Sequence, residues 1–182
     1  MQVPSHSPAL FKLIDLNEQV LSMLGMLRSS LGEGIALSAS LTPRLGGVRV
    51  DPSAMQMAIL HLVANARIYA EQDSLLIETE NISLGSDAAC ADLGPSRDEY
   101  ICLTISNTGT GNVPKPIAHS LPSDCRMGLF IAPVYAFAKR SGGTATIRSE
   151  PGRGTTVRLC LPRAPEPAVP IRARATVQVG HV

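Results

Sequence analysis

The chain has few aromatic side chains, only 3% of its 182 residues, and it contains no tryptophan. Its core must therefore be built from Leu, Ile, Val, Ala and Met, and the apolar content of 45% is too high for a disordered segment. The net charge of +1 gives no support for a nucleic-acid-binding surface. No apolar run reaches the roughly 18 residues of a membrane span. The N-terminus also lacks the pattern of a signal peptide.

Cysteine is scarce as well, with only Cys90, Cys102, Cys125 and Cys160, and no Cys-x-x-Cys spacing. This pattern argues against a disulfide framework and against a zinc site. Cys102 and Cys160 lie in apolar, strand-like runs, so we predict that they are small buried hydrophobic residues. Such cysteine usage fits a reducing compartment, and the predicted location is cytoplasmic.

The spacing of apolar residues predicts an α+β protein. Helices are predicted over 16–30, after an Asp15 cap, from Asp51-Pro52 to about Tyr69, and over 129–140. Strands are predicted at 35–41, 46–50, 74–84, 100–106, 144–149 and 155–161. Adjacent strands interrupted by single helices favour a two-layer sandwich, with helices on one face of a mixed sheet. Residues 1–14 are predicted to be a linker, 15–163 the domain and 164–182 a flexible tail.

Polar residues recur on the predicted second helix. His61, Asn65 and Tyr69 follow one another at intervals of four and share one stripe of a largely apolar helix. The stripe is interpreted either as a site where Asn65 offers its amide oxygen to hydrated magnesium or as a solvated helix face. These residues by themselves leave both interpretations open.

Glycine-rich segments follow further along the chain. Gly109 and Gly111 follow the strand that runs to about Asn107, and Gly128 with Leu129 opens the third predicted helix. Such glycines permit a close approach of backbone N–H groups to a phosphate, although each in isolation is more typical of an ordinary turn or helix start. The standard phosphate-binding loops, Gly-x-x-x-x-Gly-Lys-Ser/Thr and Gly-x-Gly-x-x-Gly, do not occur in the sequence.

Together these segments, with the final Gly154-Thr-Thr156 hairpin, resemble the catalytic ATP-binding domain of sensor histidine kinases, in the GHKL superfamily. The resemblance extends over 14–163. It implies a Bergerat-type α/β sandwich, ATP and Mg²⁺ as cofactors, and phosphoryl transfer from ATP to a histidine supplied by another domain or partner.

The resemblance also assigns roles. It implies that Asn65 binds Mg²⁺, that Tyr69 lies against adenine, and that Asn107 stands at the adenine-binding position of the first glycine box. His61 then belongs to the same box as Asn65. The remaining nucleotide-binding positions implied are Gly109, Gly111, Gly128, Leu129 and Thr156.

Several of these positions depart from the family pattern. The family usually has Asn where His61 stands, Asp where Asn107 stands, and Gly where Phe130 stands; the lid over 112–127 is short. A buried hydrogen bond to a charged group contributes roughly 1.5–3 kcal/mol, so its loss at Asn107 corresponds to about tenfold or more in affinity. The sequence therefore predicts ATP and Mg²⁺ binding that is weakened or lost.

Three functions fit these observations. The first is a two-component histidine kinase catalytic domain, whose partner is a helical dimerisation and phosphotransfer domain, since only His6 precedes the domain. The second is a non-catalytic pseudo-kinase module that docks on a partner kinase or response regulator. A Ser/Thr kinase of the anti-sigma-factor type is the third. We expect an enzyme to be improved by Asn107→Asp with Phe130→Gly, and a docking module to be indifferent to both changes.

Overall fold

The computed structural model describes residues 11–32, 34–68, 74–83, 99–107, 126–150, 154–165 and 175–179. Three helices are present in these ranges: α1 (Leu16–Leu31), α2 (Pro52–Ile68) and α3 (Arg126–Arg140). The strands are β1 (Lys12–Ile14), β2 (Ala36–Leu41), β3 (Val48–Val50), β4 (Ser74–Ser83), β5 (Glu99–Asn107), β6 (Thr144–Glu150), β7 (Gly154–Pro162) and β8 (Ala175–Val179).

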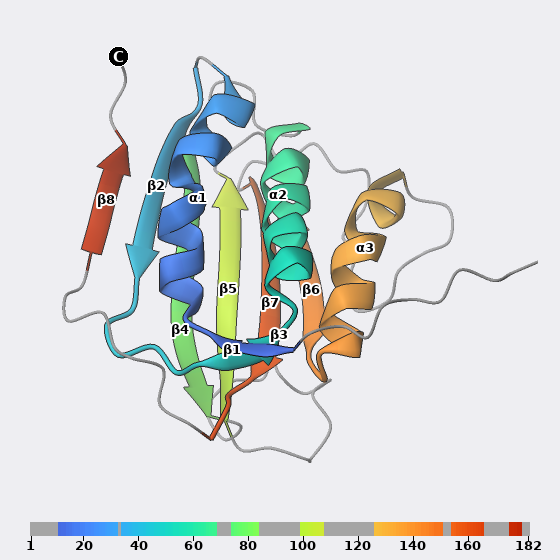
Figure 1. Cartoon of the computed structure of the whole chain (residues 1–182). Helices are drawn as coiled ribbons and strands as arrows, with labels where there is room; N and C mark the ends of the chain where they lie inside the picture. Colours follow the sequence, from blue (N-terminus) through green and yellow to red (C-terminus); the bar gives the residue numbers. More distant parts are fainter. Residues whose placement is uncertain are drawn as a thin grey trace, which may run out of the picture.

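Six strands form one mixed sheet in the order β6-β7-β5-β4-β2-β8. The β2 and β4 pair is parallel, and the other neighbours are antiparallel. The parallel pair requires a crossover, and α2 lies within that crossover between β2 and β4. The three helices cover one face of the sheet (Figure 1), as the predicted α+β sandwich requires.

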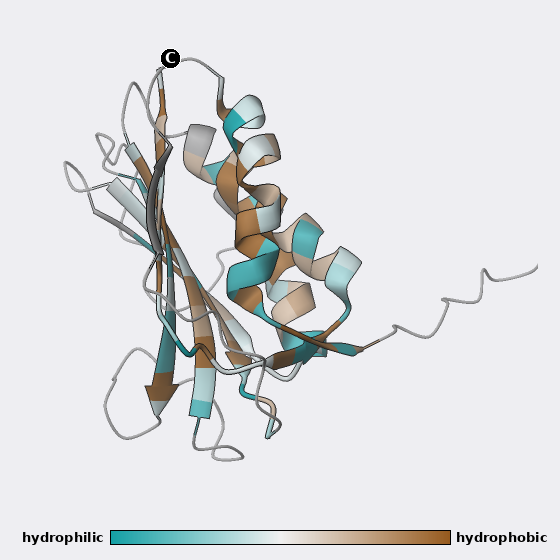
Figure 2. Cartoon of the chain, turned by 60° about the vertical axis from the view of Figure 1, so that its left-hand side comes forward, coloured by the Kyte–Doolittle hydropathy of each residue, from teal (hydrophilic) through white to brown (hydrophobic). Residues whose placement is uncertain are grey.

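The core lies between the helices and the sheet, where the apolar colouring concentrates (Figure 2). The apolar stripe predicted on the first helix is buried, and so is that predicted on the second. These buried stripes comprise Leu16, Val20, Met23, Leu27 and Leu31 of α1, and Met55, Ala58, Ile59, Leu62 and Ala66 of α2. Helical periodicity thus predicted correctly which faces pack on the sheet.

A small two-stranded sheet joins the starts of the first two helices. β1 pairs antiparallel with β3, and each strand runs directly into a capping aspartate, Asp15 before α1 and Asp51 before α2. The Asp15 carboxylate accepts hydrogen bonds from the N–H groups of Asn17 and Glu18 at 2.8 and 3.4 Å. Asp51 does the same for Ser53 and Ala54 at 2.9 and 3.2 Å.

The Asp15 cap gives a first testable prediction. Asp15→Ala removes the acceptor for these N–H groups, so we expect the free energy of unfolding to fall by about 1 kcal/mol. Asp15→Asn keeps an acceptor oxygen and should change stability much less. Urea unfolding of both variants checks the difference, and an equal loss in both would mean that charge, rather than the cap, matters.

Three assignments from the sequence differ from the structure. Residues 12–14, predicted to belong to a linker, form β1, because β3 offers them an open edge. Residues 175–179, within the predicted flexible tail, form β8 and pair with β2. The third helix begins at Arg126 rather than near Leu129, so Gly128 lies inside its first turn.

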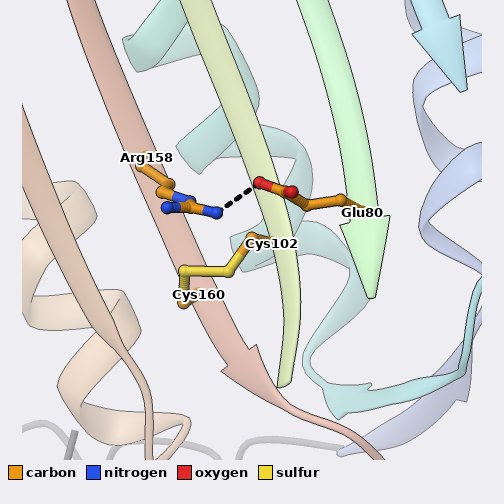
Figure 3. The surroundings of a disulfide bond; sticks show 4 residues. All are labelled: Glu80, Cys102, Arg158 and Cys160. Atoms are coloured by element: carbon orange, nitrogen blue, oxygen red, sulfur yellow. Dashed lines mark hydrogen bonds and ion pairs between the residues drawn. A yellow bond between two sulfur atoms is a disulfide. The ribbon is translucent and has the colours of Figure 1, made fainter. Parts of the chain in front are cut away.

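The prediction for cysteine is wrong in one respect. Cys102 and Cys160 are buried, with exposures of 0% and 3%, but they form a disulfide (Figure 3). They lie 58 residues apart in sequence, so local spacing gives no sign of the bond. The β5–β7 register places them directly opposite each other, with Cα atoms 4.2 Å apart. The disulfide lies on the sheet face that the helices leave uncovered, beside the ion pair between Arg158 and Glu80 (Figure 3).

Candidate functional site

Several of the predicted site segments meet at one end of the sheet. β5 ends there at Asn107, β7 begins at Gly154, and the C-terminal end of α2 and the start of α3 lie at the same end (Figure 1). The register confirms the strand part of this arrangement, since Asn107 pairs with Leu75 on one side and with Thr155 on the other. Segments that are far apart in sequence therefore form one small region.

Asn107 is the centre of this region. Its side chain is buried, with only 3% of the residue exposed. The Nδ2 group donates to the carbonyl oxygen of Ala66 in α2 at 2.9 Å. Its Oδ1 atom accepts the N–H of Thr155 in β7 at 2.6 Å. One amide thus connects β5 to both a helix and a neighbouring strand.

Gly154 permits the close approach of β7 to Asn107. Its φ is +90°, and a Cβ placed there would lie 1.9 Å from the Asn107 carbonyl oxygen. No side chain fits at that distance, and few residues other than glycine adopt that backbone conformation. The sequence predicts Gly154 only as part of a hairpin turn, whereas in the structure it leaves room for the Asn107 backbone.

The polar residues of α2 approach the same region from the helix side. His61 and Asn65 are both half-buried, and Asn65 directly precedes Ala66, the residue whose carbonyl Asn107 holds. Asn65 already makes a polar interaction within the protein. Tyr69, the third member of the predicted stripe, lies outside the described residues.

The other predicted residues are only partly placed. Gly109, Gly111 and the predicted lid up to residue 125 lie outside the described residues. Gly128 and Leu129 lie in the first turn of α3, where the structure describes the backbone and not the side chains. The same holds for Phe130, so the predicted crowding of the phosphate turn by its ring stays a prediction.

Thr156 does not lie with the other candidates. It pairs with Ser106 and shares a strand face with Cys160, so it belongs to the sheet face that carries the disulfide. Thr155, which is not among the predicted site residues, lies opposite Asn107 and is buried. Strand alternation was the available signal, because Val157 is apolar and buried and Thr155 shares its face.

The residues present fit a nucleotide-bound magnesium ion better than a metal centre held by protein alone. Among the described residues, no group of three or more His, Cys, Asp or Glu side chains is close enough to hold a metal ion. Magnesium, however, commonly takes one or two protein oxygens and completes its shell with water and substrate phosphates. The amide oxygen of Asn65 is an oxygen ligand of the kind that magnesium takes from proteins.

Comparison with known proteins identifies the family of the chain. The family model for the histidine kinase-, DNA gyrase B- and HSP90-like ATPases matches residues 50–165, well over half of the chain. The sensor kinase CckA of Brucella abortus (strain 2308) is 25% identical over 160 residues, a match that covers 84% of this chain and 17% of that protein. The chain therefore spans a small part of the length of this relative. Among the described helices, none has the length and apolar character needed to cross a membrane.

Solved structures agree in fold. Full-length ShkA, crystallised with AMPPNP, matches with a TM-score of 0.66 at 17% identity, over 89% of this chain and 33% of that one. The Acinetobacter baumannii histidine kinase AdeS matches with a TM-score of 0.61 at 18% identity, over 86% of this chain and 69% of that one. The resemblance to the ATP-binding domain of sensor histidine kinases is thereby confirmed, and this chain belongs to the family of histidine kinase-, DNA gyrase B- and HSP90-like ATPases.

Proposed function

We propose that this chain is the ATP-binding catalytic module of a two-component sensor histidine kinase, which passes the γ-phosphoryl group of ATP to a histidine on another domain or partner. The observation that carries the proposal is the meeting of α2, the end of β5 and the start of β7 at one place, joined through Asn107. The family supplies the chemistry, and these contacts supply a fixed frame for it.

In this proposal each residue has a distinct task. The Asn65 amide oxygen offers a ligand to the magnesium ion that accompanies ATP, and His61 lies one turn before it on α2. Oδ1 of Asn107 has a second lone pair for the exocyclic amino group of adenine, besides the one used by Thr155. The buried Thr155, rather than Thr156, is the threonine on the adenine side. Phosphoryl transfer depends mainly on positioning and charge neutralisation, so a rigid frame is the main contribution of the protein.

Magnesium dependence tests the role of Asn65. Titration of a fluorescent ATP analogue should give saturable binding that Mg²⁺ strengthens and that unlabelled ATP competes away. Asn65→Ala should weaken the binding measured with Mg²⁺ by about tenfold or more, corresponding to about 1.4 kcal/mol, because the ion loses a protein ligand. Binding in EDTA should change little.

Ala64→Ser provides the matched control, since Ala64 is exposed on the adjacent position of α2. This variant should bind like the unmodified chain. If Asn65→Ala weakens binding equally with and without Mg²⁺, Asn65 does not act through the metal.

A second function is favoured by one observation. Nδ2 and Oδ1 of Asn107 each already form a hydrogen bond with a protein group. This is expected where the side chain stabilises the fold and does not bind a nucleotide. The alternative is a non-catalytic module that docks on a partner kinase or response regulator. A folded chain that binds no ATP analogue at millimolar concentration, with or without Mg²⁺, would support this alternative.

A further inference from the structure

We propose that Asn107 is a positioning residue that fastens the C-terminal end of α2 to β7, and that this chain requires an amide there rather than the carboxylate typical of the family. This role deepens the proposed function, and the effect expected on nucleotide binding rests on that function. The effect expected on stability does not depend on nucleotide binding.

The hydrogen-bond partners fix the orientation of the amide. The Ala66 carbonyl only accepts hydrogen bonds, and the Thr155 N–H only donates. Nδ2 must therefore face Ala66 and Oδ1 must face Thr155, as observed at 2.9 and 2.6 Å. A rotation of the amide by 180° would set two acceptors against each other and two donors against each other.

A carboxylate cannot reproduce this pair of contacts. One of its oxygens would still accept from Thr155, but the other would face the carbonyl oxygen of Ala66. The position is buried, so water cannot easily satisfy the two acceptors. The sequence predicts that Asn107→Asp together with Phe130→Gly improves an enzyme. The buried contacts of Asn107 lead to the opposite expectation for Asn107→Asp, which should be harmful in this chain.

The hydrogen bond from Asn107 to Ala66 also affects the position of Asn65, the proposed magnesium ligand. Ala66 directly follows Asn65, so the Nδ2 contact holds the backbone immediately beside the amide proposed to bind magnesium. Gly154 reinforces the arrangement, because only a residue without a side chain lets β7 approach the Asn107 backbone so closely. Loss of the contact should therefore displace Asn65 as well as weaken the fold.

Thermal unfolding tests the stability arm. At neutral pH, Asn107→Asp should lower the Tm by roughly 4–10 °C, as expected for a buried acceptor left without a donor in a chain of this size. As the pH falls, the Tm difference from the unmodified chain should shrink. A protonated carboxyl group can donate its O–H to Ala66 and accept from Thr155, so its stabilisation is present at low pH and is lost as the pH rises.

The unmodified chain and the Asn107→Asp variant share all their other ionisable residues. The contribution of those residues to the pH dependence cancels when the Tm values of the two proteins are subtracted at each pH. The ionisable residues on the strands and the helix around Asn107 are His61 and Arg67 of α2, Glu78 and Glu80 of β4, Glu99 and Tyr100 of β5, Arg148 and Glu150 of β6, and Arg158 of β7. Asn107→Leu, of similar volume and without polar atoms, separates space filling from hydrogen bonding. Asn107→Leu should be less stable than the unmodified chain at every pH, and the difference in Tm between them should not shrink as the pH falls.

The nucleotide arm compares affinity with and without Mg²⁺. Asn107→Asp should bind the ATP analogue more weakly than the unmodified chain, with the larger loss in Mg²⁺. Higher Tm or tighter binding of Asn107→Asp at neutral pH would overturn the proposal. If the unmodified chain binds no nucleotide, the proposed function fails. The pH-dependent difference in Tm between the two proteins still decides whether the Asn107 amide holds α2 to β7.

Discussion

Replacing Gly154 with alanine is expected to lower the free energy of unfolding by roughly 2–5 kcal/mol, through backbone strain combined with overpacking. The added Cβ would lie 1.9 Å from the Asn107 carbonyl oxygen and 2.8 Å from its carbonyl carbon. These are backbone atoms of a central strand, so they cannot move aside as the end of a side chain can. The φ of +90° adds strain of its own for any residue with a side chain.

Gly142→Ala is the matched control for this experiment. Gly142 also has a positive φ, +74°, but a Cβ there meets only Pro162 Cγ at 3.5 Å, an ordinary contact. It should therefore cost about 1 kcal/mol, the strain of the backbone alone. Urea unfolding of both variants measures the difference. Equal losses would show that the close approach to Asn107 has no energetic consequence.

Removing the Cys102–Cys160 disulfide should also have a large effect. The bond joins residues separated by 58 positions, so it constrains a long loop of the unfolded chain. By the entropy of loop closure, Cys102→Ser with Cys160→Ser should lower stability by roughly 2–4 kcal/mol. Burial of the two hydroxyls in the apolar cluster with Ile82 and Tyr100 adds to the loss.

Reductant distinguishes the cross-link from the packing. Dithiothreitol should lower the free energy of unfolding of the unmodified chain and should change that of the double serine variant much less. Peptide mapping without reductant should recover Cys102 and Cys160 in one cross-linked species. If both proteins respond to dithiothreitol alike, the stabilising bond is not this one.

Local sequence patterns predicted most of the fold. The 3.6-residue period located α1 and α2 and their buried faces, and the capping positions of Asp15 and Asp51 follow from residue type and place. β1 and β8 were assigned to a linker and a tail, because their pairing partners, β3 and β2, are remote in sequence and lie outside those segments. The early start of α3 was missed for a similar reason, since the segment before it has no apolar repeat.

The sequence by itself determined the fold class and the places of most helices and strands, because periodicity and capping are local properties. The resemblance of its polar and glycine-rich segments to the sensor histidine kinases indicated the family, which the family model confirms. Only the tertiary structure decided the pairing of Cys102 with Cys160 and the engagement of Asn107 by Ala66 and Thr155. Each of these depends on the register between β5 and β7 or on how α2 lies against β5. Such alignments are set by packing among residues distant in sequence, so no single segment contains them.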